Sequence, residues 1–234
     1  MSISDKARGR SKENLSSDDV KELLDRINKG GPSSFKPART LVEAAENYPE
    51  VVAQHHDRLA SVLGSPLPSM VRRQLYDVAL ETDIKSTSSL KKIINSAETE
   101  LIEADGNTRL LIYRLYETAA RAGVSIEPDQ LDALVRGVAD SPVDTPATAA
   151  MDAYVTIVTQ RDSVGDKELA PLVDFIESDF PEIRSAAFDA LLDIINTSDI
   201  RSDISKDGFR IVIENYENSG IDCERTAAAL EELK

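Results

Sequence analysis

The sequence predicts an all-α fold, built as a solenoid of about five helix pairs with a capping helix at each end. Three observations lead to this prediction. Apolar residues recur at i, i+3, i+4 and i+7 almost everywhere after residue 41. Turn-forming residues interrupt this pattern at short intervals, and alternating strand patterns are nearly absent. The apolar positions also match between successive hairpins at offsets of 37 to 41 residues, which an ordinary helical bundle does not explain.

Composition excludes several classes of protein. The chain has 234 residues, no Trp and one cysteine, Cys223, which excludes an intramolecular disulfide and any multi-cysteine metal site. No apolar run approaches the ~18–20 residues of a membrane-spanning helix. The first residues lack the apolar core of a secretory signal. Together these features predict a cytoplasmic protein without a membrane partner.

The charge is unevenly distributed along the chain. Residues 1–40 carry a net charge of +3, whereas residues 41–234 carry −18. A field of that sign repels phosphate groups, which argues against a nucleic-acid partner. Asp outnumbers Glu by 23 to 19 and Arg outnumbers Lys by 16 to 11, a composition that resembles proteins from a high-salt cytoplasm. The acidity therefore has two interpretations, adaptation to salt or recognition of a partner.

The N-terminal part is expected to form two segments. Residues 1–16 are rich in Lys, Arg and Ser and are expected to be a disordered tail. Residues 17–35 are expected to hold an N-terminal helix and a linker. Within that helix, Val20, Leu23, Leu24 and Ile27 follow the helical period. The helix either caps the first repeat, which would otherwise expose its core, or binds another protein.

The solenoid is predicted to occupy residues 36–234. Its expected helix pairs cover residues 36–64, 66–104, 106–140, 145–178 and 181–218, and a last helix covers 222–233. Helix starts are predicted at Ser17, at Thr87 and at Asp179, the last with Pro181 in the first turn.

The clearest repeat lies in the second half of the chain. TAAMDAYVTIV at 148–158 matches SAAFDALLDII at 185–195, an offset of 37 residues. The second helices match at an offset of 38, so Leu134 and Val135 correspond to Leu172 and Val173. We call a set of equivalent positions in successive hairpins a column. Stacked hairpins bury the apolar columns between them. The residues expected in the core are therefore Leu134, Val135, Leu172, Val173, Ile176, Ala187, Phe188 and Leu191.

Two stretches resemble the first helix of HEAT repeats. They are SPLPSMVRRQLYDVAL at 65–80 and DFPEIRSAAFDALLDII at 179–195, in which a Pro-bearing turn leads into an apolar stripe. The resemblance covers residues 36–220 and implies a right-handed α-α superhelix of the HEAT/armadillo type. It further implies that Arg72, Arg109 and Arg184 bond an acid or a backbone carbonyl at the turn. Asp77, Asp152 and Asp189 are the candidate acids.

No arrangement of side chains predicts catalysis or a cofactor. His55 and His56 are adjacent, so their side chains diverge by about 100° on a helix and cannot chelate one ion. They occupy core-type columns, and we interpret them as structural. Cys223 has no nearby His and is interpreted as a free thiol. No glycine-rich phosphate-binding motif is present, so the sequence argues against a small-molecule substrate, a cofactor and a metal.

The resemblance also implies that the second helices line the inner face. Their outward columns carry both charges without stacking aromatics, which suits a protein or peptide rather than nucleic acid. The candidate partner-binding residues are Lys91, Asn95, Asp132, Arg136, Asp174, Arg210 and Glu214.

The sequence thus predicts a non-catalytic protein–protein interaction scaffold that binds another protein or a peptide. The alternative is an enzyme on the same fold. HEAT-like DNA glycosylases have a similar size, but they resemble this chain in architecture only, since they hold DNA on basic, Trp-bearing surfaces. A bilin-lyase-type maturation factor is the other enzyme considered.

Overall fold

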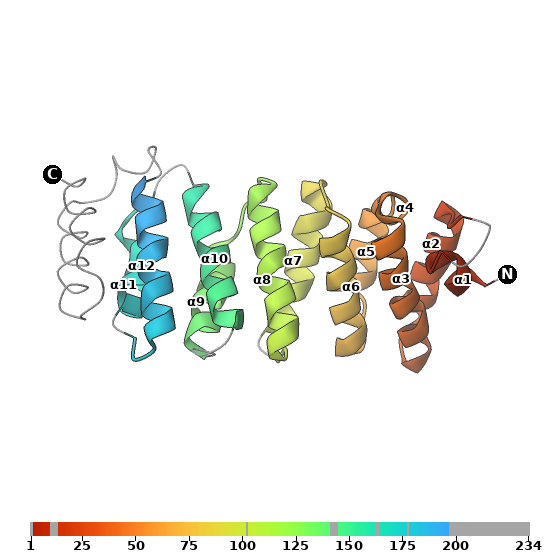
Figure 1. Cartoon of the computed structure of the whole chain (residues 1–234), viewed down its shortest axis with the longest axis horizontal. Helices are drawn as coiled ribbons and strands as arrows, with labels where there is room; N and C mark the ends of the chain where they lie inside the picture. The colour runs from red at the N-terminus through yellow and green to blue at the C-terminus, as the bar shows by residue number, and fades with distance from the viewer. Residues whose placement is uncertain are drawn as a thin grey trace. The chain divides into compact units, whose positions relative to one another are not determined.

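The computed structural model describes residues 2–9, 14–101, 103–140, 145–161, 164–176 and 178–196. All regular structure within these ranges is helical. The chain forms two compact units that divide between Ser125 and Ile126. Within each unit, successive helices lie side by side (Figure 1).

The described part of the first unit contains eight α-helices and one 3-10 turn, η1. Their bounds are α1 Ile3–Ala7, α2 Ser17–Asn28, η1 Pro32–Ser34, α3 Phe35–Asn47, α4 Pro49–Ala53, α5 His56–Leu63, α6 Ser69–Glu81, α7 Thr87–Leu101 and α8 Gly106–Arg121. Helices α3, α6 and α8 pack against one another in sequence. Helices α2, α5 and α7 do the same, so this unit has two layers of helices (Figure 1).

The core of the first unit lies between these two layers. Leu41 of α3, Leu75 of α6 and Ile112 of α8 are fully buried from one layer. Leu59 of α5 and Ile93 of α7 are buried from the other. Complete burial of such a side chain stabilises a fold by about 1.5–3 kcal/mol. The apolar columns therefore hold neighbouring pairs together, as the repeat predicts.

The N-terminal helix α2 covers the first repeat. It packs against α3, α4 and α5. Its four apolar residues Val20, Leu23, Leu24 and Ile27 are all buried. Of the two alternatives, capping the first repeat or binding another protein, the structure shows the helix in the capping position. The boundaries at residues 16/17 and 35/36 remain predictions.

The segment expected to be a disordered tail contains a short helix in its described part. This helix, α1, contacts α3 and buries Ala7. Ser2 caps it through the backbone N–H of Asp5, and Arg8 forms a 2.8 Å ion pair with Glu43 of α3. Lys6 of α1 forms a second ion pair, with Asp19 of α2 at 3.4 Å. The low apolar content of the tail did not reveal this helix, because a single buried alanine and two ion pairs attach it.

The first pair departs from the predicted hairpin. Instead of one second helix through residues 52–59, α4 ends at Ala53 and α5 begins at His56. His55 has non-helical backbone angles, with φ −114° and ψ 18°. The imidazole nitrogen Nε2 of His55 lies 2.7 Å from the Ser17 hydroxyl of α2. This tertiary contact, which periodicity cannot show, accompanies the break.

The helix caps lie close to their predicted places. Ser16, not Ser17, caps α2, since its hydroxyl accepts from Asp19 N–H while the Asp19 carboxylate accepts from Ser16 N–H. Ser86, not Thr87, accepts from Ser89 N–H at the start of α7. Pro181 is the first residue of α12, as predicted. Several polar residues precede each helix, so composition alone locates a cap only to within one residue.

Helix α8 ends in a Schellman motif that precedes the boundary between the units. Gly123 N–H bonds to Ala120 O, and Val124 N–H bonds to Ala119 O. Gly123 has φ +77°, a left-handed conformation that only glycine adopts without strain. Glycine at this position therefore ends the helix sharply.

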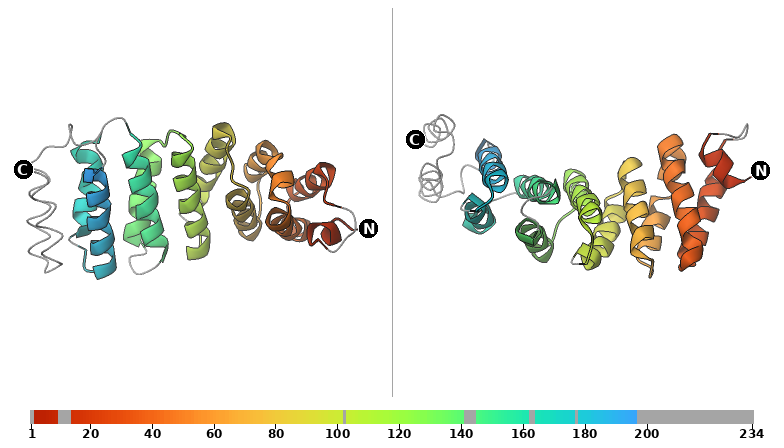
Figure 2. Two further views of the ribbon diagram at one scale, coloured as in Figure 1. Left: turned by 45° about the horizontal axis from the view of Figure 1, so that its top comes forward. Right: turned by 60° about the horizontal axis from the view of Figure 1, so that its bottom comes forward.

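The described part of the second unit contains four helices: α9 Pro128–Asp140, α10 Thr145–Thr159, α11 Asp166–Ile176 and α12 Pro181–Asn196. Helix α10 packs against α9 and α12, and α11 packs against α12. Figure 2 shows α10 and α12 in one layer, with α9 and α11 in the other. The predicted pair 106–140 is therefore divided, since α8 belongs to the first unit.

Most of the predicted core residues of this unit are confirmed. Buried side chains include those of Leu134, Leu172, Ile176, Ala187, Phe188 and Leu191. Val135 and Val173 are only half-buried, so the prediction is wrong for them. Adjacent helical residues point about 100° apart, so one residue of such a pair can lie at the edge of the interface, as in α9 and α11. In α7 the residues in the same two columns, Ile93 and Ile94, are both buried. The second half of the pair 181–218, the helix at 222–233 and Cys223 lie outside the described residues.

Candidate functional site

The candidate partner-binding residues lie on exposed faces of second helices. Lys91 and Asn95 are exposed one turn apart on α7. Asp132 and Arg136 are exposed one turn apart on α9, where Arg136 Nε donates to the Asp132 backbone carbonyl at 3.3 Å. Asp174 is exposed on α11. Arg210 and Glu214 lie outside the described residues.

These residues are divided between the two units, and we call the residues of each unit a patch. The α7 patch belongs to the first unit, while the α9 and α11 residues belong to the second. The first patch offers an ammonium and an amide, and the second offers two carboxylates and a guanidinium. Such groups pair with charged and amide groups of a peptide. Because the patches carry charges of both signs, they favour a peptide by the order of its charges rather than by its net charge.

Two arginines of the column, Arg72 and Arg184, contact the turns, as the HEAT resemblance implies. Arg72 Nη2 donates to the Ser65 carbonyl at 3.2 Å, and Arg184 Nη1 donates to the Ser178 carbonyl at 2.7 Å. The acid beside Arg72 is Glu100 of α7, at 3.9 Å, rather than the exposed Asp77. Both guanidinium groups therefore tie the start of a first helix to the preceding turn.

Tyr76, Glu100 and Arg72 form a cluster inside the α6–α7 pair. The Tyr76 hydroxyl donates to Glu100 Oε2 at 2.9 Å. Burial raises the pKa of the Glu100 carboxyl above its ordinary value, although the Tyr76 hydrogen bond and the Arg72 charge oppose this shift. Burial also raises the pKa of the Tyr76 phenol. These groups bond to one another across the pair, which is a structural arrangement.

The two histidines point toward different elements. His55 meets Ser17 of α2, whereas His56 Nε2 lies 2.9 Å from the Thr82 hydroxyl after α6. Burial lowers the pKa of His56 below its ordinary value, and the charges of Asp57 and Asp83 partly oppose this. Both residues are half-buried and join neighbouring helices, in agreement with the structural interpretation.

In the second unit, the carboxylate of Glu168 stabilises the turn between α10 and α11. Glu168 accepts from Gly165 N–H at 3.0 Å and from Arg161 Nη1 at 3.2 Å. The Tyr154 hydroxyl donates to the Glu168 backbone carbonyl at 2.6 Å. The carboxylate of Glu168 is therefore engaged by its own turn and is a poor candidate for acid–base work.

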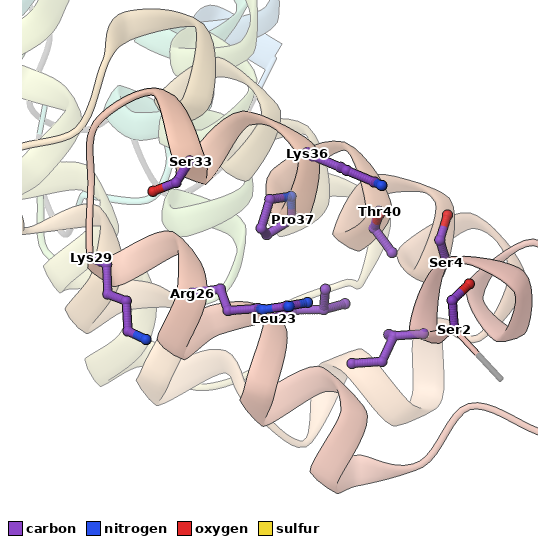
Figure 3. A pocket seen from close by; sticks show the side chains of 10 residues that line it. Ser2, Ser4, Leu23, Arg26, Lys29, Ser33, Lys36, Pro37 and Thr40 are labelled. Atoms are coloured by element: carbon purple, nitrogen blue, oxygen red, sulfur yellow. The ribbon is translucent and has the colours of Figure 1, made fainter.

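A cavity of about 530 Å³ opens between α1, α2, η1 and α3 (Figure 3). Three cationic residues line it: Arg26 and Lys29 from the end of α2, and Lys36 from the start of α3. Figure 3 shows Arg26 and Lys36 extending from opposite helices toward the side where α1 lies. None of the lining residues that the structure describes is acidic.

The remaining lining of this cavity is both apolar and hydroxylic. Ile3, Leu23 and Pro37 supply apolar surface. Thr40 of α3 and Ser33 of η1 supply hydroxyl groups, as do Ser2 and Ser4 of α1. The volume falls within the roughly 300–1,000 Å³ of small-molecule sites. We call this space the amino-terminal cavity.

Sequence reasoning missed the amino-terminal cavity. Its lining residues come from four separate elements, which only the packing of α1 onto α3 brings together. One signal was present, because the first 40 residues carry +3 in a chain of net charge −15.

Among the described residues, no helix is both long and apolar enough to span a membrane. In the same ranges, no group of three or more His, Cys, Asp or Glu side chains is placed to hold a metal ion.

Comparison with known proteins identifies the fold. No family model and no curated protein matches the chain. Among solved structures, two engineered proteins determined by the Northeast Structural Genomics Consortium, targets OR329 and OR366, each match with a TM-score of 0.61 at 17% identity. The matches cover 92% of this chain and 96% and 98% of theirs.

A third similar structure is a designed armadillo repeat protein in complex with the peptide (KR)4. It matches with a TM-score of 0.58 at 15% identity, covering 92% of this chain and 99% of that one. These likenesses and the all-helical structure confirm the predicted fold class. The chain is an all-α repeat solenoid of the armadillo/HEAT type.

Proposed function

We propose that the chain is a non-catalytic interaction scaffold that binds a Lys/Arg-rich segment of another protein on the exposed faces of its second helices. The observation that carries the proposal is its likeness to a designed armadillo repeat protein in complex with an entirely basic peptide, (KR)4. This chain offers the opposite sign, with a net charge of −15.

Charge supports a basic partner at a distance. Residues 41–234 carry −18, so a cationic segment is attracted to the chain before it makes contact. The attraction is long-range only in dilute salt, because the screening length falls from ~10 Å at 0.1 M to ~3 Å at 1 M. Direct pairing with exposed side chains then determines binding at high salt.

The second-helix residues supply such pairing. Asp132 and Asp174 in the second unit are exposed carboxylates that can accept bidentate bonds from arginine. In the first unit, Lys91 repels a basic side chain of the partner, whereas the amide of Asn95 can form a hydrogen bond with the partner. Each patch therefore selects a different stretch of a partner, which gives specificity beyond net charge.

The proposal is tested with labelled peptides. We expect fluorescence polarisation to show saturable binding of (KR)4 and none of a Glu/Asp-rich peptide of equal length. The double variant Asp132→Asn/Asp174→Asn should weaken (KR)4 binding by about tenfold, since two charge-assisted contacts are lost.

The matched control removes the same charge from a first helix. Asp77 and Glu81 are exposed on α6, and Asp77→Asn/Glu81→Gln should change binding by less than about twofold. If both double variants weakened binding equally, the loss would depend on net charge alone, which would contradict a site on the second helices. Absence of (KR)4 binding would contradict the basic partner.

We also propose that the acidic surface is adapted to a salt-rich cytoplasm. Its support is compositional, namely the excess of Asp over Glu and of Arg over Lys. Carboxylates bind water and cations strongly, which keeps a protein soluble where other surfaces associate.

A further inference from the structure

We propose that the amino-terminal cavity binds a small organic phosphate, a phosphate monoester with an apolar or aromatic body. The phosphate group would lie between Arg26 and Lys36, and the organic body of the ligand would cover the half-buried side chain of Ile3. This ligand site is independent of the peptide-binding surface, which uses second-helix residues elsewhere.

The charges of the cavity carry the first step. Among the described residues, no carboxylate lies within 4.0 Å of the Lys29 or Lys36 ammonium group. Arg26 has one carboxylate neighbour, Glu22 at 3.7 Å, and both side chains are more than half exposed. Exposed pairs of this kind are weak and exchange readily. All three cations are therefore available to an anion, in a chain that is acidic overall.

Thr40 adds a hydrogen-bond donor to these charges. It lines the cavity and is only 4% exposed, so its position is fixed by packing. A threonine hydroxyl at a cavity wall can donate to a bound anion. A phosphate oxygen held by Lys36, one turn earlier on α3, is a suitable acceptor.

The size and lining of the cavity define the rest of the ligand. About 530 Å³ exceeds the space that an inorganic phosphate ion occupies. The half-buried side chain of Ile3 would be left uncovered by an ion alone. An organic body removes this surface from water and adds affinity.

Phosphate fits the cations better than carboxylate does. A phosphate monoester carries about −1.5 to −2 charges at pH 7 and offers three acceptor oxygens. A carboxylate carries one charge and two oxygens. Guanidinium groups bind phosphate oxygens in a bidentate manner, while lysine acts as a point charge. Arg26 and Lys36 supply one group of each kind.

The test uses 1-naphthyl phosphate, whose fluorescence is free of tryptophan background because the chain has no Trp. Titration of the full chain should show saturable 1:1 binding. We expect 1-naphthoate, inorganic phosphate and 1-naphthol to bind at least about fivefold more weakly, since each lacks either the dianion or the apolar body.

Variants locate the site. Arg26→Gln/Lys36→Gln should weaken 1-naphthyl phosphate binding by about tenfold or more, and Thr40→Val by about threefold. Lys92 and Arg114 are exposed cations on α7 and α8 of the same unit. The double variant Lys92→Gln/Arg114→Gln loses the same charge, and its affinity should stay within about twofold of the original.

Circular dichroism establishes that each variant is folded at the temperature of the titration. Three results would overturn the proposal: no saturable binding, equal affinity for 1-naphthol, or equal weakening by the cavity and control double variants. An inorganic phosphate affinity equal to that of the naphthyl ester would also overturn it, because the apolar walls would then contribute nothing.

Discussion

The Tyr76 hydroxyl donates a 2.9 Å hydrogen bond to Glu100 Oε2, joining α6 to α7 inside one helix pair. One repeat further along, on α8, the buried Tyr116 hydroxyl forms no hydrogen bond among the described residues. The two tyrosines thus occupy similar buried positions with opposite hydrogen-bonding states.

This contrast predicts opposite effects of the same substitution. Tyr76→Phe should lower the free energy of unfolding by about 1–3 kcal/mol, because it leaves the buried Glu100 carboxyl without its donor. Tyr116→Phe should be neutral or stabilising, because it removes a polar group that has lost its hydration. Urea unfolding of the two variants measures both values, and an equal loss in the two would contradict the assigned bond.

The lowered pKa of His56 predicts a pH-dependent stability. The folded state opposes protonation of His56, so its contribution is present above the ordinary pKa of 6.5 and is lost as the pH falls through the lower folded value. The wild-type chain should therefore lose stability relative to His56→Gln between pH 8 and pH 5. Parallel unfolding curves at several pH values measure this difference. A constant difference across that range would contradict the prediction.

Adjacent residues of α11 provide a test of the packing in the second unit. Leu172 is 1% exposed, whereas Val173 is half-buried. Leu172→Ala should cost about 2–5 kcal/mol of unfolding free energy, while Val173→Ala should cost clearly less. Thermal and urea unfolding measure both losses. The reverse order would mean that the repeat alignment places the core on the wrong face.

The salt-adaptation proposal predicts that stability depends on ionic strength. The thermal midpoint should rise between about 0.1 M and 2 M KCl, because screening relieves repulsion among the carboxylates. Circular dichroism at matched protein concentration measures the midpoints. The same midpoint at both salt concentrations would refute the adaptation.

Much of the fold was predictable because apolar period and repeat spacing determine it. The pair 66–104 corresponds to α6 and α7, and the start of α12 at Pro181 was predicted. The break before His56 was not predictable, since it accompanies a contact with Ser17 from another helix. Local periodicity contains no information about such a partner.

The candidate sites also differ in how far the sequence alone could reveal them. The repeat columns identified five candidate residues that the structure shows to be exposed: Lys91, Asn95, Asp132, Arg136 and Asp174. The turn contact of Arg72 followed from the HEAT resemblance. The amino-terminal cavity could not be predicted, because Thr40 and Arg26 become neighbours only when α2 and α3 pack.

The short helix α1 has a practical consequence for binding experiments. Ser2 and Ile3, at its start, border the amino-terminal cavity. An affinity tag fused ahead of them would be held at the mouth of that space, and a polyhistidine sequence could occupy or screen it. Titrations should therefore use protein from which any leading tag has been cleaved.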